Sequence, residues 1–150
     1  MHVLDAINKA EEKMQSRKDF FLCSCFVSCK DFSETDEWTV IFYNPSSRNV
    51  VECECNENGI QVSDESKAIS NPSRLVKNDI VADEFDILKK VGGDFDIKPV
   101  SILVSLRTKD NMTMWTVSVV TQDICATIYD IDAKTGDIIR KEKTGLVKRV

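Results

Sequence analysis

Histidine is almost absent from this sequence, and glycine and proline are scarce: the 150 residues include one His, five Gly and three Pro. The one histidine, His2, lies beside the start of the chain, where we expect no fixed geometry, whereas a general base must be held within hydrogen-bond reach of its substrate. No Gly-rich phosphate loop, Walker motif or dinucleotide fingerprint occurs either. We therefore expect no catalytic residue, no enzyme activity and no cofactor.

The sequence also lacks a long apolar run. No stretch approaches the roughly 20 residues that cross a bilayer as a helix, and the first residues form an amphipathic, acid-containing pattern rather than that of a secretion signal. These features predict a cytoplasmic protein without membrane contact. Because the cytosol keeps thiols reduced, we expect the six cysteines to be free.

Positive charge is in deficit, with 20 basic against 25 acidic residues and a net charge of −5. Such a balance disfavours nonspecific attraction to nucleic acid or anionic lipid, so the predicted partner is another protein or a second copy of the chain. A basic tail is the exception, and short runs of this kind usually form a solvated face. It contains Arg140, Lys141, Lys143, Lys148 and Arg149.

What the sequence does contain is a repeat. Trp38-Thr39-Val40 recurs 77 residues later as Trp115-Thr116-Val117, and Gly59 recurs as Gly136 at the same distance. Hydrophobic periodicity predicts the same element order around both copies, a helix followed by strands. The predicted helices span about residues 2–16 and 79–91, and the predicted strands 21–30, 38–43, 49–55, 60–62, 99–107, 115–120, 124–132 and 137–141.

This order predicts an α+β protein made of two pseudo-symmetric tandem units, each with one helix packed on a mainly antiparallel sheet of three to four strands. The units span residues 1–63 and 78–150, joined by a polar linker over 64–77. Trp38 and Trp115 lead strands whose next inward residues are valines, so we expect both to anchor the core. Gly59 suits a turn with positive φ.

The run from Tyr129 to Ile139, Tyr-Asp-Ile-Asp-Ala-Lys-Thr-Gly-Asp-Ile-Ile, follows the Trp115 strand and resembles a PepSY domain. That family pairs a Trp-led strand with a strand ending in aspartate, here Asp132, and a Thr-Gly turn, here at Gly136. In the first unit Asn56-Glu57-Asn58-Gly59 takes the place of the turn. The resemblance implies a cystatin-like arrangement, no enzyme activity, and an inhibitory or regulatory binding role.

Four cysteines, spaced as Cys23-x-Cys25 and Cys53-x-Cys55, are predicted to point in pairs to one face of two strands, where thiolates can close a zinc site. The usual Cys-x-x-Cys spacing is missing. The second copy has Val100 and Ile102 at the first pair, and Tyr129 and Ile131 at the second if the first copy's turn is one residue shorter, which indicates small buried hydrophobes. A zinc or redox module remains an alternative.

The opposite face of the two first strands carries hydroxyl and basic side chains beside Phe26 and Leu103. We expect a binding groove or dimer contact there. The candidates are Ser24, Ser28, Lys30, Ser101, Ser105 and Arg107, the last three at the 77-residue offset from the first three.

Two aspartates on one predicted strand, Asp130 and Asp132, raise the alternative of a shared cation. The other interpretation is that Asp132 bonds to turn backbone and Asp130 lies on a solvated face. The sequence as a whole favours a non-catalytic protein-binding or regulatory module, inhibitor-like in character. The alternatives are the cysteine-based zinc or redox module and a small-ligand carrier with a pocket between the units.

Overall fold

The computed structural model describes residues 1–145, so Lys148 and Arg149 of the basic tail lie outside the described residues. Within them the chain forms two α-helices and nine strands. The first half contains α1 (Val3–Lys13), β1 (Phe21–Cys29), β2 (Trp38–Asn44), β3 (Asn49–Asn56), β4 (Gly59–Val62) and β5 (Ser66–Lys67). The second half contains the short 3-10 helix η1 (Lys77–Asp79), α2 (Glu84–Gly92), β6 (Ser101–Lys109), β7 (Met112–Val120), β8 (Cys125–Asp132) and β9 (Ile138–Gly145).

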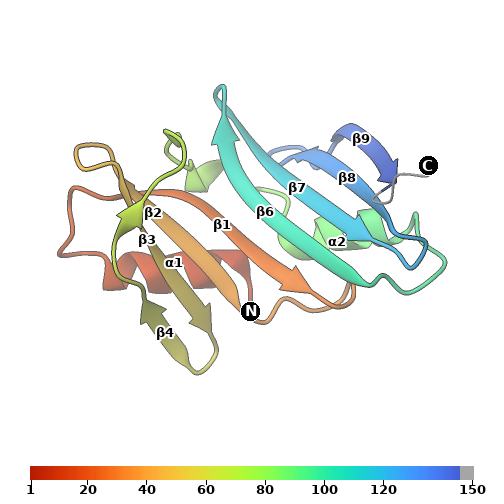
Figure 1. Cartoon of the computed structure of the whole chain (residues 1–150), viewed down its shortest axis with the longest axis horizontal. Coiled ribbons are helices and arrows are strands. Elements are labelled where there is room, and N and C mark those ends of the chain that lie inside the picture. Colours follow the sequence, from red (N-terminus) through yellow and green to blue (C-terminus); the bar gives the residue numbers. More distant parts are fainter. Residues whose placement is uncertain (146–150) are drawn as a thin grey trace.

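All the strands belong to one antiparallel sheet, in the order β4-β3-β2-β1-β6-β7-β8-β9, with β5 beside β3 (Figure 1). The α+β class is confirmed, and the strands predicted for the two units are joined in one continuous sheet. The first strands of the two units, β1 and β6, pair from Ser24 opposite Arg107 to Cys29 opposite Ile102. This pairing removes two exposed edges, each of which would otherwise present unpaired backbone groups.

Both α-helices pack on the same face of the sheet, behind it in the view of Figure 1. α2 begins later than the predicted residue 79 because Asp83 is its N-cap: the Asp83 side chain accepts from the Asp86 N–H, and the Asp86 side chain accepts from the Asp83 N–H. α1 has no capping side chain of its own. Instead the Val3 N–H donates to Oε1 of Glu84, at the start of α2, at 2.9 Å.

Glu84 is therefore a buried carboxylate shared by the N-termini of the two helices. His2 Nδ1 lies 3.2 Å from its Oε1, while Oε2 has no hydrogen-bond partner among the described residues. Burial raises the pKa of this carboxyl, and the Val3 N–H and His2 oppose the shift. The positive ends of two helix dipoles converge on one acid here.

The two tryptophans are core anchors, as predicted. Both are 0% exposed, and their ring centroids lie 6.3 Å apart beneath the middle of the sheet. Trp38 Nε1 donates to the Met1 carbonyl and Trp115 Nε1 to the Ala82 carbonyl, each at 2.9 Å. Each acceptor lies two residues before its helix, so the contact repeats in both units.

The strand register corrects the 77-residue alignment of the first strands. Val27 pairs with Trp38, whereas Leu106 pairs with Trp115, so equivalent positions in β1 and β6 are 79 residues apart. The reason is that Leu106 and Trp115 are two residues closer in sequence than Val27 and Trp38, and an even shift keeps every side chain on its face. Phe26 and Ser105 thus become equivalent, and they pair with each other at the centre of the sheet.

The third strands and their turns follow the prediction. Trp38 pairs with Cys55 and Trp115 with Ile131, which confirms that the first copy's turn is one residue shorter. The Asp132 carboxylate accepts from the Lys134 N–H at 2.8 Å, and the Asn56 side chain accepts from the Gly59 N–H at 3.1 Å. Both turn glycines, Gly59 and Gly136, have positive φ.

Candidate binding surface

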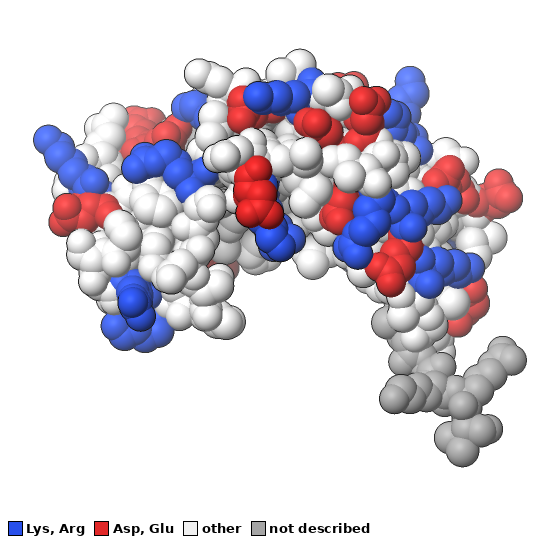
Figure 2. All heavy atoms as spheres, turned by 90° about the horizontal axis from the view of Figure 1, so that it is seen from above, with Lys and Arg blue, Asp and Glu red and all other residues white. Residues whose placement is uncertain are grey.

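The sheet face turned away from the helices is hollowed, and its centre is uncovered. Figure 2 shows the molecule from above as an arch, whose hollow opens on the side of the sheet opposite α1 and α2. The two central strands, β1 and β6, form the middle of this surface, which we call the open face. An antiparallel sheet can be solvated on one side, so exposure alone does not make a binding site.

The predicted binding residues do come together on the open face. Phe26 lies opposite Ser105, Ser28 opposite Leu103, and Ser24 opposite Arg107. Two candidates lie at the ends of the strands: Ser101 is the first residue of β6, and Lys30 lies one residue beyond β1.

Short hydroxyl side chains continue across the neighbouring strands. Thr39 of β2 lies beside Phe26, Thr116 of β7 beside Ser105, and Ser118 beside Leu103. Leu103 is 44% exposed, so the centre of the open face combines apolar surface with a floor of small side chains. The sequence analysis missed Thr39, Thr116 and Ser118, although their alternation with buried tryptophan and valine could have identified them.

Two walls flank this floor. On one side the linker crosses the open face, held by a hydrogen bond of 2.9 Å from the Tyr43 hydroxyl to Asn71 Oδ1. On the other, Asp130 accepts from the Thr116 hydroxyl at 2.9 Å and from Arg140 Nε at 2.7 Å. The prediction of a solvated Asp130 is therefore wrong, because β9 supplies Arg140 as its partner and covers it.

The cysteines do not share one face as predicted. A β-bulge between Leu22 and Ser24 turns Cys23 to the open face, where its Sγ donates to the Ile41 carbonyl at 3.3 Å. Cys25, Cys53 and Cys55 remain in the core beneath the helices. The four thiols thus cannot converge on one metal ion, and residues 1–145 contain no group of three or more His, Cys, Asp or Glu placed to hold one.

Thiol reactivity is also suppressed. Burial raises the pKa of Cys23, Cys53 and Cys55 to about 11 and that of Cys25 still further. These groups stay protonated at neutral pH, whereas thiolates are the nucleophiles and metal ligands. All six cysteines are free.

Two adjoining cavities lie where the linker crosses the sheet, and both border Cys23 and Ser24. One, of about 310 Å³, is lined by Ile41, Val50, Glu52 and the linker, and we call it the Ile41 cavity. The other, of about 360 Å³, lies between linker residues 70–73 and β6 residues 107–109, and we call it the Arg107 cavity. It brings together both predicted units and the linker.

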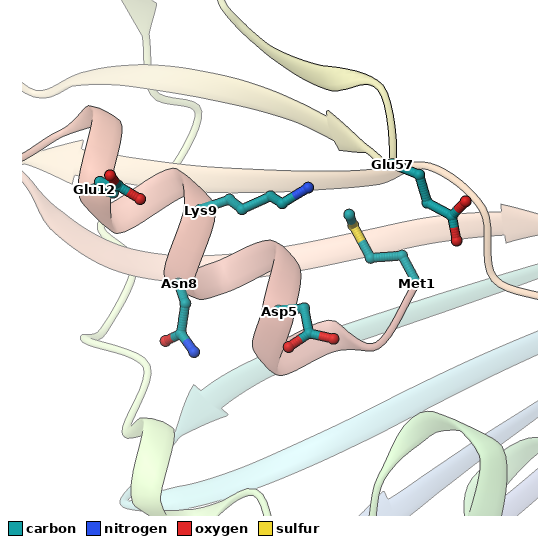
Figure 3. Close-up of a pocket in the computed structure, with 6 residues that line it drawn as sticks. All are labelled: Met1, Asp5, Asn8, Lys9, Glu12 and Glu57. Atoms are coloured by element: carbon teal, nitrogen blue, oxygen red, sulfur yellow. The ribbon is translucent and has the colours of Figure 1, made fainter.

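Other hollows each have at least one acidic side chain in their lining. The cavity of about 380 Å³ in Figure 3 lies between α1 and the β3–β4 turn, and Lys9 extends across it toward Glu57. Its remaining lining is Met1, Asp5, Asn8 and Glu12. A cavity of about 390 Å³ beside β8 and β9 holds the ion pairs Lys141–Asp94 and Lys143–Asp123.

Comparison with known proteins establishes the fold alone. The crystal structure of a putative lipoprotein from Clostridium difficile 630 superposes with a TM-score of 0.67 at 18% sequence identity, covering 96% of this chain and 93% of that one. No protein-family model matches the sequence, and no curated protein does so. The PepSY resemblance thus stays a prediction. Neither helix among the described residues has the length and apolar character needed to cross a membrane.

Proposed function

We propose that this protein is a non-catalytic binding module that recognises another protein through the open face. The observation that carries the proposal is the uncovered centre of the sheet, where Phe26 and the 44% exposed Leu103 lie among short hydroxyl side chains. Protein interfaces commonly have such an apolar centre with a polar surround. The hollow shape favours a partner that inserts a convex segment. This protein would then act on that partner as an inhibitor or regulator.

Self-association is the first alternative to separate, because a second copy could cover the same face. Sedimentation velocity over a wide concentration range measures it directly. A photo-crosslinking residue at position 103 is then expected to capture one partner, while the same residue at position 81 captures none. Val81 is the matched control, since it is 69% exposed and lies in the segment leading into α2.

The decisive measurement is binding by the purified partner. Leu103→Lys is expected to weaken it at least about tenfold, because it places a charge in the apolar centre, whereas Val81→Lys leaves it unchanged. Equal effects of the two substitutions, or none from either, would remove the open face from the proposal.

A second candidate function is the binding of a small ligand between the units. It is favoured by the Arg107 cavity, which is lined by Ser24 of the first unit, Ser70 to Ser73 of the linker and Arg107 of the second unit. Binding there would raise the melting temperature through linkage. A thermal-shift panel of uncharged, cationic and anionic compounds tests this function without assuming the ligand's class.

A further inference from the structure

The charged side chains that line the Arg107 cavity are all basic, whereas Glu11 lies among the basic side chains of the cavity between α1 and the linker. No acidic side chain lines it, while Arg107 and Lys109 both do, in a chain whose net charge is −5. None of the ion pairs among residues 1–145 involves Arg107 or Lys109. Two cations therefore border the cavity without a protein counter-ion in the described part of the chain.

Hydrogen-bond donors from β1, β6 and the linker border the same cavity. Ser24 lies opposite Arg107 in the sheet, and Ser70 and Ser73 border the cavity from the linker. The Oδ1 atom of Asn71 accepts from Tyr43, which leaves the amide N–H groups of that side chain as donors. The lining thus offers positive charge and donors, which is the complement of an oxyanion.

The β-bulge in β1 contributes to this arrangement. At the bulge Cys23 and Ser24 together oppose the single residue Ile41, so both border the cavity. The β6–β7 pairing has no such irregularity. Bulges often re-aim side chains beside functional sites.

We propose that the Arg107 cavity binds a phosphate group, with Arg107 as the principal ligand and Lys109 and the hydroxyls of Ser24, Ser70 and Ser73 in support. Two cations match the charge of a phosphate dianion, and donors from three segments of the chain match its several oxygens, of which a carboxylate has only two. This inference rests on the second candidate function, for which it names the ligand class.

The test is a titration of ¹⁵N-labelled protein with inorganic phosphate at constant ionic strength, followed by ¹H–¹⁵N spectra. Chemical-shift changes are expected at Ser24 and over residues 70–73 and 107–109. Arg107→Gln is expected to weaken binding about tenfold or more, and Lys109→Gln to weaken it less. Lys89→Gln is the matched control, because Lys89 is an exposed cation of α2, on the other side of the sheet, and borders neither cavity.

The outcomes separate the two ideas. Shifts centred on Arg140 and Lys141 instead, or equal losses in Arg107→Gln and Lys89→Gln, overturn the phosphate site. If an uncharged compound binds at residues 70–73 and phosphate does not, the phosphate site is wrong while the ligand-binding function stands. If no compound of the panel binds, both are wrong. Spectra of each variant without phosphate show whether the fold is retained.

Discussion

Because of the bulge in β1, we expect serine substitutions at Cys23 and Cys25 to differ in their cost to stability. Strict strand alternation would predict similar costs. Cys23 and Cys25 lie two residues apart, so an unbroken strand would place both in the core. The bulge instead leaves Cys25 in the core and turns Cys23 to the open face. Substituting each by serine therefore tests the local register of the sheet.

The expected magnitudes differ because the surroundings differ. Cys25 is 0% exposed among apolar side chains, so Cys25→Ser buries a hydroxyl there and is expected to cost about 1–3 kcal/mol of unfolding free energy. For a chain of this length that lowers the melting temperature by about 2–12 °C. Cys23 is 3% exposed, but its Sγ already donates to the Ile41 carbonyl, which a serine hydroxyl can also do, so Cys23→Ser is expected to cost less than Cys25→Ser, about 1 kcal/mol or below.

Urea unfolding under reducing conditions measures the loss of unfolding free energy in Cys23→Ser and in Cys25→Ser, each against wild type. Cys25→Ala is the control, because it removes the sulfur without burying a polar group and is expected to be milder than Cys25→Ser. If Cys23→Ser proves as costly as Cys25→Ser, Cys23 belongs to the core and the bulge is wrong.

Three further substitutions test other parts of the fold. Burial raises the pKa of Glu84 above its value in the unfolded chain, so the fold loses stability as the pH rises from about 4, where the unfolded chain begins to ionise, through the higher pKa of the folded protein. Glu84→Gln is thus expected to be more stable than wild type at pH 7 and equal to it below about pH 4; a difference that stays constant in urea titrations from pH 3 to 8 refutes this. Asp83→Ala removes the N-cap of α2 and is expected to cost about 1 kcal/mol in the same titrations, whereas Asp83→Asn retains most of the stability. Gly136 has φ of 78°, so Gly136→Ala is expected to cost about 1 kcal/mol or more by calorimetry, while Gly93→Ala, at φ of −62°, is neutral or stabilising. Equal effects at the two glycines would contradict the assigned turn.

The sequence determined the features that depend on neighbours along the chain. Alternation assigned Trp38 and Trp115 to the core and Ser24 and Ser105 to the opposite face, because the two sides of a strand are set by a period of two. The Asp132 and Gly136 turn was readable because its hydrogen bonds close within a few residues. The repeat also predicted which residues of the two third strands are equivalent. An alignment gap of one residue was needed there to keep the buried side chains of both copies on the same face.

Only the tertiary structure decided the features that depend on distant partners. The pairing of β1 with β6 joins the predicted units in one sheet, and no local pattern specifies which strands become neighbours. The bulge that turned Cys23 away from Cys25 is a property of the β1–β2 pair rather than of β1 itself. The Arg107 cavity likewise exists because the linker packs over two strands from different halves of the chain, bringing together side chains about 80 residues apart in sequence.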